Sequence, residues 1–324
     1  MCTAVTYKTK AHYFGRNLDL TYSYHETVTV TPRNYPFRFR KVNALLNHYA
    51  MIGMAYVLDE YPLYYDATNE KGLSMAGLNF PGNACYKPET QGVDNVATFE
   101  LIPWILAQCG DVGEARALLE HINIWDENFS AGLPAATLHW MISDREQSIV
   151  VEAVSDGIKI YDDPVGVLTN NPPFDFQMLY LDNFMNITAE QAVNRFSEKL
   201  DLKPYSLGMG GLGLPGDLSS SSRFVKAAFT KMNSVSGDSE MESVSQFFHI
   251  LGAVEQQRGC VKDEKGQYEV TVYSSCCNTD RGIYYYTTYE NRQITGVDMH
   301  REDLAGNRLI SYPLLQEQQI NMQN

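Results

Sequence analysis

Strand-like and helix-like segments alternate in blocks along this chain of 324 residues, and that order limits the folds open to it. Short runs rich in β-branched residues occupy most of the first eighty positions and return twice later, with Pro, Asn and Gly between them. We expect strands in eight of these runs: Cys2–Tyr7, His12–Asn17, Glu26–Thr31, Met51–Val57, Ala136–Ile142, Gln147–Val154, Gln267–Ser275 and Gly282–Tyr289.

The segments between these runs carry apolar residues at helical spacing. The first of them follows Asp94 or Asn95, either of which can cap a helix, and Pro103 marks its first turn or kinks it. A pattern that resembles a capping box, Thr188 with Gln191, begins another. Together these patterns predict helices in five regions: after Asp94, Val112–His121, Thr188–Leu200, from the serines at 219–222 onward, and Ser239–Val254.

No internal repeat is visible in the sequence, and no stretch rich in Pro, Gly or Ser divides it. Apolar residues make up 44% of the chain, which supplies a sizeable core. The order of strands, helices, strands, helices and strands fits two layers of mixed sheet covered by helices. We therefore predict a single α+β domain over residues 1–324.

The chain is acidic, with 25 Lys and Arg against 39 Asp and Glu and a formal net charge of −14. A negative field of this kind repels phosphate backbones. The densest basic run, Arg38, Arg40 and Lys41, is short, so we expect no nucleic-acid partner. The composition favours a protein that handles a small molecule.

The N-terminus and the cysteines indicate a compartment. Lys8 and Lys10 interrupt the first residues before an apolar signal segment could form. The most apolar long stretch, Ala44–Leu58, is too short to span a bilayer. The six cysteines include no C-x-x-C pair and are too sparse for a disulfide scaffold. We expect a cytoplasmic, reduced protein that does not insert into membranes.

Two patterns that could hold a cofactor are weak. Gly208–Gly213 matches G-x-G-x-x-G, but Pro204 precedes it and Pro215 stands where a helix should begin, which favours a glycine-rich loop. The seven histidines show no spacing for a shared metal, and each fits a surface or core position. The sequence predicts no metal and no organic cofactor, while spacing alone leaves a Cys–His pair open.

The most informative residue is Cys2. A small residue behind an initiator methionine normally permits removal of that methionine, and Cys2 would then carry both a thiol and a free α-amine. The pKa of such an amine is about 7.7–8.0, so a useful fraction is neutral at neutral pH. It can take the thiol proton, directly or through one water, and so replace the usual histidine base. Cys2 is thus a candidate nucleophile.

The strand expected next brings a cation and an anion close to the N-terminus. An arginine such as Arg16 beside a thiol favours the thiolate and lowers the thiol pKa. A carboxylate such as Asp19 can orient an α-amine. The two residues are three apart, so a regular strand aims them at opposite faces. Both can serve Cys2 only where a bulge or the strand end intervenes, and otherwise they form a structural ion pair.

Six ordered motifs give the chain a resemblance to a known family. They are M-C-T-A at 1–4, F-G-R-N-L-D at 14–19, T-P-R-N-Y-P-F at 31–37, G-L-N-F-P-G at 77–82, L-T-N-N-P at 168–172 and L-P-G-D-x-S-S-x-S-R-F at 214–224. Over essentially its whole length the chain resembles the choloylglycine hydrolase family, most closely its bile salt hydrolases. The resemblance implies the αββα sandwich of the N-terminal nucleophile hydrolases, with two stacked sheets between helical layers.

The resemblance also implies roles for six residues. Cys2 matches the nucleophile and α-amine base, Arg16 the arginine beside the thiol, and Asp19 the carboxylate that contacts the amine. The remaining three are Asn79, whose backbone N–H helps to form the oxyanion hole, Asn170, the side-chain oxyanion donor, and Arg223, the second active-site arginine. Asn170 is preferred over Asn171, because family members keep the first of these positions where the second differs.

The implied activity is hydrolysis of glycine- or taurine-conjugated bile salts through a thioester at Cys2, without metal or cofactor. A penicillin V acylase of the same family and a non-catalytic binder of amphipathic ligands are the alternatives. The expected substrate contacts are Arg16 and Asn79 of the catalytic set with three pocket residues: Leu18, Tyr24 and Leu133. They belong to aromatic or apolar segments at 18–24, 55–65 and 129–136. Family members are often homotetramers, which we carry over as an expectation.

Overall fold

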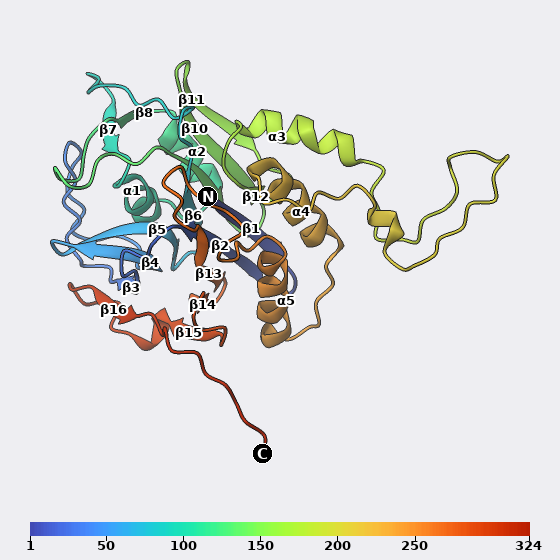
Figure 1. Ribbon diagram of the computed structural model, residues 1–324. Helices are drawn as coiled ribbons and strands as arrows, with labels where there is room; N and C mark the ends of the chain where they lie inside the picture. Colours follow the sequence, from blue (N-terminus) through green and yellow to red (C-terminus); the bar gives the residue numbers. More distant parts are fainter.

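The computed structural model describes residues 1–324, and two β-sheets dominate it (Figure 1). The first has six strands in the order β12-β1-β2-β13-β14-β15, and its described pairs are antiparallel. In that order the strands span Val167–Leu168, Cys2–Lys8, His12–Leu20, Val270–Asn278, Ile283–Thr288 and Thr295–Asp298. Cys2, the first residue of β1, therefore lies inside this sheet, next to β2.

The second sheet has eight strands in the order β11-β10-β9-β6-β5-β4-β3-β16. These span Gly157–Asp162, Ser148–Val154, Leu138–Ser143, Ser74–Asn79, Tyr61–Asn69, Met51–Leu58, Thr27–Thr31 and Ile310–Pro313. A separate parallel pair joins β7 (Asp94–Ala97) to β8 (Ile122–Trp125). The final strand of the chain, β16, thus forms one edge of the second sheet, beside β3.

Helices cover the outer faces of both sheets. On the second sheet, α1 (Leu101–Gln108) packs against β5 and β6, and α2 (Val112–Leu119) follows it. On the first sheet lie α4 (Ser220–Asn233) and α5 (Glu240–Gly252), with α3 (Phe174–Leu181) beside α4 (Figure 1). Short 3₁₀ turns occupy Asp182–Phe184, Met209–Gly211 and Met299–Arg301. This is the αββα arrangement, and the predicted fold class is confirmed.

Strand alternation divides the core into two layers. On β9, Met141 belongs to the apolar cluster that contains Cys2 and the α4 and α5 side chains, whereas Trp140 and Ile142 join the cluster around α1. Successive side chains of a strand point to opposite faces, so one strand feeds both layers. The central strands β4, β6, β9 and β10 are therefore mostly buried on both faces.

The predicted start of one helix is wrong, and a second predicted helix is absent. Residues from Asp94 form strand β7, and α1 begins only at Leu101, with Pro103 in its first turn. Residues 188–200 form no helix, and the side chain of Gln191 donates to the carbonyl of Ser206 instead of completing a capping box. Apolar spacing alone does not hold a short helix that packs against nothing, because isolated helices of this length are marginal in water.

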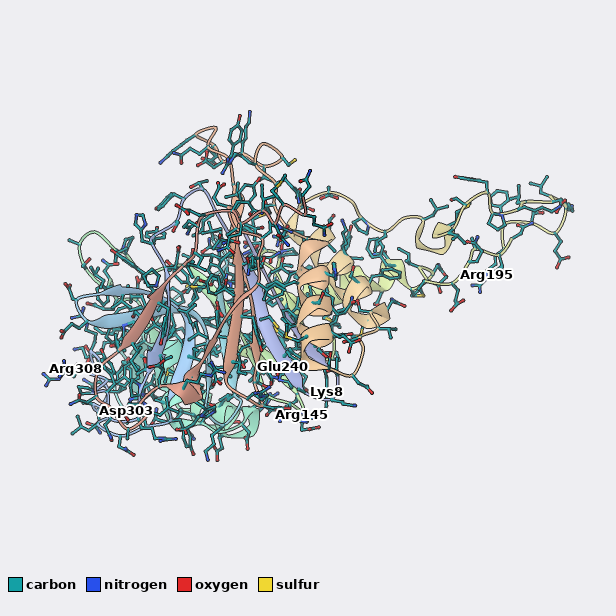
Figure 2. The ribbon with its side chains drawn as sticks, turned by 90° about the horizontal axis from the view of Figure 1, so that it is seen from below. Lys8, Arg145, Arg195, Glu240, Asp303 and Arg308 are labelled. Carbon is teal, nitrogen blue, oxygen red and sulfur yellow. The ribbon has the colours of Figure 1, made fainter.

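Residues 186–213, here named the arm, instead extend away from the body of the molecule, with Arg195 far out on it (Figure 2). Most of its apolar side chains are exposed: Val193, Phe196, Leu200, Leu202, Tyr205, Leu207 and Leu212. The G-x-G-x-x-G segment lies at the base of the arm, around the turn Met209–Gly211, as the loop interpretation predicted. The helices of the structure include none with the length and apolarity needed to span a membrane.

Candidate active site

Cys2 is the first residue of β1, and the register with β2 decides what surrounds its thiol. Cys2 pairs with Leu18 and Ala4 pairs with Arg16. Alternate residues of a strand share a face, so these four side chains project from the same side of the first sheet, toward the second sheet. The thiol of Cys2 and the guanidinium of Arg16 therefore lie in the layer between the sheets, where Cys2 is 2% exposed.

Backbone carbonyls of the facing sheet hold Arg16. Its Nη1 donates to the carbonyl oxygen of Tyr65 at 2.9 Å and to that of Gly77 at 2.5 Å, while its Nη2 has no partner among the protein groups. Burial alone lowers the pKa of this guanidinium, but the nearby Cys2 and other acidic groups outweigh burial and raise it above the ordinary value. Arg16 is thus a fixed cation with a spare N–H beside the thiol.

Asp19 lies on the opposite face of β2, toward the helical layer. Its Oδ1 accepts a hydrogen bond of 2.6 Å from Thr271, and its Oδ2 lies 3.9 Å from Nη1 of Arg223. Burial raises the pKa of Asp19, and Arg223 opposes that rise. The same burial lowers the pKa of Arg223. Both charged side chains are fully buried and out of contact with water. Each therefore offsets the cost of burying the other.

Arg223 also reaches the backbone of the nucleophile. Its Nη1 donates to the carbonyl oxygen of Cys2 at 2.5 Å and to Oγ1 of Thr3 at 2.6 Å. Its Nη2 donates to Oδ1 of Asn170 at 2.8 Å. The planar fork of one guanidinium therefore joins β1 to the segment that follows β12, which a lysine could not do with the same geometry.

The serine-rich sequence before Arg223 builds the first turn of α4. Oδ1 of Asp217 accepts from the backbone N–H of Ser219, and its Oδ2 accepts from the hydroxyl of Ser222. The hydroxyl of Ser220 accepts from the backbone N–H of Asn170 at 2.8 Å. The helix start and the asparagine segment are thereby tied together, so the L-P-G-D-x-S-S-x-S-R-F sequence positions Arg223 and Asn170 as a unit.

Asn170 is the point where the candidate residues meet. Its Oδ1 accepts from the backbone N–H of Cys2 at 2.7 Å as well as from Arg223. Its Nδ2 donates to the carbonyl oxygen of Asn79 at 2.7 Å. Both contacts to Oδ1 come from donors, which fixes the orientation of the amide. The next residue, Asn171, instead donates to the carbonyl of Pro81 and does not join this network.

The chain described here retains Met1, so the nitrogen of Cys2 is an amide. The terminal ammonium of Met1 donates to the carbonyl oxygen of Asp19 at 2.8 Å and contacts the carboxylate of Glu269. Burial lowers the pKa of this amine, against the influence of Cys2 and Asp19. Removal of Met1 would leave the new α-amine of Cys2 next to Asn170.

The expected pocket residues are less closely linked to Cys2. Leu18 is buried and pairs with it directly. Tyr24 is half-buried in the β2–β3 connection, where its hydroxyl meets that of Tyr22 at 2.7 Å. Leu133 lies in the β8–β9 connection and pairs with Ser130. The contact of all three residues with a substrate stays a prediction.

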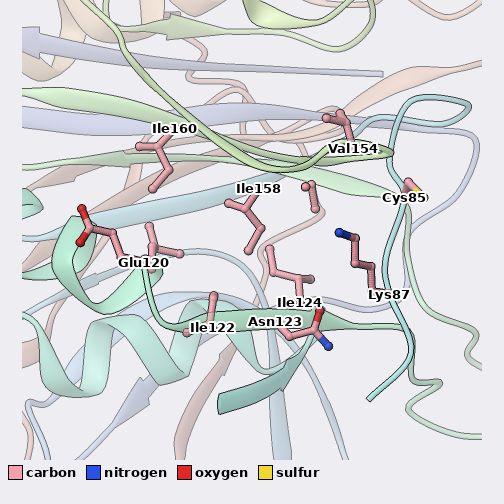
Figure 3. A pocket seen from close by; sticks show the side chains of 12 residues that line it. Cys85, Lys87, Glu120, Ile122, Asn123, Ile124, Val154, Ile158 and Ile160 are labelled. Carbon is pink, nitrogen blue, oxygen red and sulfur yellow. The ribbon is translucent and has the colours of Figure 1, made fainter. Parts of the chain in front are cut away.

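A cavity of about 270 Å³ elsewhere in the molecule is formed by the segment after α2 and by β10 and β11 (Figure 3). Its lining includes Ile122, Ile124, Ile158 and Ile160, with Lys87 at its rim, and none of the six candidate catalytic residues. No group of three or more His, Cys, Asp or Glu side chains is arranged to hold a metal ion.

Sequence reasoning missed the residues that hold the candidate groups in place. Thr271 bonds Asp19, Ser220 bonds the backbone of Asn170, and Nε2 of Gln177 donates to the carbonyl of Asn170 at 2.6 Å. Ser220 lies inside a motif that already drew notice. Thr271 and Gln177 carry no local signal, because their partners are 252 and 7 residues away and are set by the fold.

Comparison with known proteins identifies the family. The profile of the linear amide C–N hydrolases, choloylglycine hydrolase family, matches residues 2–312. A bile salt hydrolase/transferase of Lactiplantibacillus plantarum is 56% identical over 319 residues, with 98% of each chain covered. A second bile salt hydrolase/transferase, of Clostridium perfringens, is 38% identical, with 100% of each covered.

Solved structures extend the comparison to the fold. A mutant of conjugated bile acid hydrolase from Clostridium perfringens superposes with a TM-score of 0.93 at 37% identity, covering 100% of both chains. Penicillin V acylase from Agrobacterium tumefaciens shares the fold, with a TM-score of 0.75 at 20% identity over 96% of this chain and 90% of the acylase. The chain therefore belongs to the choloylglycine hydrolase family and is a linear amide C–N hydrolase.

Proposed function

We propose that this hydrolase cleaves the amide bond of glycine- or taurine-conjugated bile salts, with Cys2 as its nucleophile. The observation that carries the proposal is the convergence on Cys2 of Arg16 from one face of the sheet and of Asn170 and Arg223 from the other. The relatives named above, identical at 56% and 38% over nearly the whole chain, are bile salt hydrolase/transferases and support the substrate class.

The reaction begins when removal of Met1 turns the amide nitrogen of Cys2 into a free α-amine. This amine takes the thiol proton, and the cation of Arg16 favours the thiolate. The thiolate then attacks the amide carbonyl, which forms the C–S bond and moves the π electrons onto oxygen. The backbone N–H of Asn79 and Nδ2 of Asn170 stabilise that oxyanion.

Collapse of the tetrahedral intermediate breaks the C–N bond. The α-ammonium of Cys2 supplies the proton to the leaving amine, so glycine or taurine departs and a thioester remains. Water, deprotonated by the same amine, attacks the thioester and releases the bile acid and the thiol. Asp19 and Arg223 hold the amine and the backbone of Cys2, and neither of them exchanges a proton with the substrate.

In this proposal the steroid lies against the segments at 18–24, 55–65 and 129–136. Aromatic side chains support an apolar wall there: Tyr24 packs against Tyr22 and Tyr56, with ring centroids 4.8 Å and 5.9 Å apart. Leu18 would contact the substrate next to the thiol, and Leu133 would close the far side. A wall of this kind suits a rigid apolar ligand with a few polar groups.

The experiment that tests the proposal compares glycocholate, taurocholate and penicillin V as substrates for the wild-type protein and Cys2→Ala. We expect hydrolysis of the bile salts by the wild-type protein and none by the variant, with unchanged circular dichroism. Faster hydrolysis of penicillin V would favour the acylase alternative. Bile-salt binding without turnover by either protein would favour a non-catalytic binder.

We further propose that the enzyme is a cytoplasmic homo-oligomer, a tetramer by family resemblance. The arm supports self-association, because Phe196 is 82% and Leu207 is 92% exposed. Exposed apolar side chains gathered on one projecting segment are typical of interaction surfaces. A second copy of the chain is the partner that would cover them, and the mass in solution tests this.

A further inference from the structure

A buried histidine–carboxylate pair lies behind the candidate oxyanion residues and has no part in the reaction described above. His139 is on β9, opposite Leu78 of β6, and Glu152 is on β10, the next strand of the sheet. Both side chains have 0% exposure. Nδ1 of His139 and Oε1 of Glu152 lie 3.0 Å apart, which is hydrogen-bond distance.

The hydrogen bonds fix the number of protons on this pair. Nε2 of His139 lies 2.8 Å from the carbonyl oxygen of Thr169, which can only accept, so Nε2 carries a proton. One further proton lies between Nδ1 and Oε1 of Glu152. The pair is therefore neutral overall, either as imidazolium with carboxylate or as imidazole with carboxylic acid. It remains hydrogen-bonded in both forms.

His139 contacts both segments that carry the oxyanion donors. Thr169, whose carbonyl it bonds, directly precedes Asn170. Phe80, which directly follows Asn79, stacks on the imidazole with ring centroids 4.2 Å apart and an interplanar angle of 5°. One ring thus touches the neighbours of both donors, which come from strands far apart in the sequence.

Glu152 extends the same support to the helix that follows. Its Oε1 also accepts a hydrogen bond of 3.0 Å from the backbone N–H of Phe174, the first residue of α3. The segment 169–174 is therefore held at its start by His139 and at its end by Glu152. Asn170 lies between these two points, so displacement of either should move its side chain.

We infer that His139 and Glu152 are positioning residues that set the distance between Asn79 and Asn170 across the oxyanion hole. This inference rests on the proposed function and adds to it two residues outside the catalytic set. Both ring nitrogens of His139 are engaged, and Phe80 covers the ring face. His139 therefore has no free lone pair to act as a general base on the substrate.

The molecule offers a matched control in His48. It is also buried, and each of its ring nitrogens lies 2.8 Å from a backbone carbonyl oxygen, Nδ1 from that of Tyr49 and Nε2 from that of Tyr35. It packs against Phe37 with ring centroids 4.8 Å apart. The same substitution at 48 and 139 thus removes similar contacts, but only His139 adjoins the oxyanion segments.

The experiment measures kcat and KM on glycocholate, the rate of Cys2 alkylation by iodoacetamide, and Tm for wild type, His139→Gln, Glu152→Gln and His48→Gln. Misplacing reacting groups by about 1 Å costs about a hundredfold in rate. We expect kcat of His139→Gln to fall by about tenfold or more. KM and the alkylation rate should stay within about twofold of wild type, because no hydrogen bond joins Arg16 to the pair.

Glu152→Gln should give an intermediate loss of kcat. A glutamine can either accept from Phe174 or donate to Nδ1 of His139 at the position of Oε1, but one atom cannot do both. His48→Gln should lower Tm without a selective loss of kcat. An equal kcat loss at 48 and 139, a parallel fall in the alkylation rate, or unchanged kcat at 139 would overturn the inference.

If His139→Gln does not fold, Glu152→Gln against His48→Gln makes the same comparison. A wild-type protein without activity on bile salts would instead overturn the proposed function, and this inference would fall with it. The two failures are therefore distinguishable from the wild-type measurement alone.

Discussion

Arg16 and Asp19 project from opposite faces of β2, and each lies near Cys2 by a different route. The guanidinium of Arg16 faces the second sheet, where it bonds the carbonyls of Tyr65 and Gly77. The carboxylate of Asp19 faces the helical layer, 3.9 Å from Arg223. Arg16 therefore lies on the side of the Cys2 thiol, whereas Asp19 is linked to Cys2 through Arg223, which donates to the carbonyl oxygen of Cys2.

Replacement of Arg16 should reduce the fraction of Cys2 present as thiolate more than it weakens substrate binding. Arg16→Gln removes the buried cation beside the thiol, so less thiolate forms at a given pH. One pKa unit corresponds to a tenfold change in thiolate at pH values well below the thiol pKa. We expect alkylation of Cys2 at pH 6 to slow by about tenfold or more. The rate of reaction with iodoacetamide, measured between pH 5 and 9, gives the midpoint of thiolate formation.

Arg16→Lys is the control for this prediction, because it keeps the charge and loses the guanidinium, whose Nη1 donates to both carbonyls. Its alkylation rate at pH 6 should stay closer to that of wild type than the rate of Arg16→Gln, while its kcat falls. A midpoint in Arg16→Gln equal to that of wild type would show that the arginine does not influence the thiol.

Alanine substitutions at the neighbouring residues Asn170 and Asn171 should have very different effects on kcat. Asn170→Ala removes the side-chain amide that bonds Asn79 and Cys2 and that is proposed to hold the oxyanion. Loss of one such donor lowers kcat by about 10²–10³-fold. Asn171→Ala removes only a bond to the carbonyl of Pro81, and its kcat should stay within about twofold of wild type.

Steady-state kinetics on glycocholate with the two alanine variants make this comparison. The larger loss at 171, or equal losses at both positions, would mean that the side-chain donor has been assigned to the wrong residue.

Stability should fall in mild acid partly through His12. This residue is buried, its Nδ1 lies 2.9 Å from Oγ1 of Thr279, and burial lowers its pKa from 6.5 to about 4. Between these values the unfolded chain binds the proton and the folded chain does not, so the contribution is complete above pH 6.5 and is lost as pH falls toward 4. From pH 7 to pH 5 this amounts to on the order of 2 kcal/mol.

Urea unfolding of wild type and His12→Asn at pH 7 and pH 5 measures this contribution. The asparagine can keep the bond to Thr279 but does not titrate, so the variant should lose less stability between the two values. An equal loss in both proteins would show that His12 is not the group responsible.

The arm should control assembly rather than chemistry. Phe196→Ser with Leu207→Ser replaces two highly exposed apolar side chains by polar ones and should shift the protein toward monomer in sedimentation velocity. The matched control is Val235→Ser with Met241→Ser, which changes side chains that are 85% and 73% exposed but lie outside the arm. Dissociation by the control pair, or none by the arm pair, would contradict the proposal.

The sheets could be predicted from sequence because their strands carry local signals. β1, β2, β9 and β10 lie within two or three residues of the predicted ranges, since β-branched runs and polar turns mark strand ends. The prediction of a helix at 188–200 is wrong for the opposite reason. The apolar residues of this segment have the spacing of a helix, but in this chain nothing packs against them, and packing supplies most of the stability of a short helix.

The candidate site residues also differ in whether a local sequence pattern predicts them. Cys2 could be proposed from chemistry alone, because a thiol and a latent amine occupy one residue. Asn79 and Asn170 have no such signal, and only a resemblance brought them forward. The sequence allows His139, like the other histidines, a surface or a core position, and the structure shows it in the core with partners at both ring nitrogens. Its position behind two oxyanion segments depends on pairings across the second sheet, which no local pattern encodes.

Mass spectrometry of the protein, quenched in acid during turnover of glycocholate, tests the central claim most directly. We predict that the active chain lacks Met1 and that a fraction of it carries one cholyl group on Cys2, since acid preserves a thioester. Cys2→Ala should never carry this group. Active protein that retains Met1, or a cholyl group on any other residue, would contradict the account.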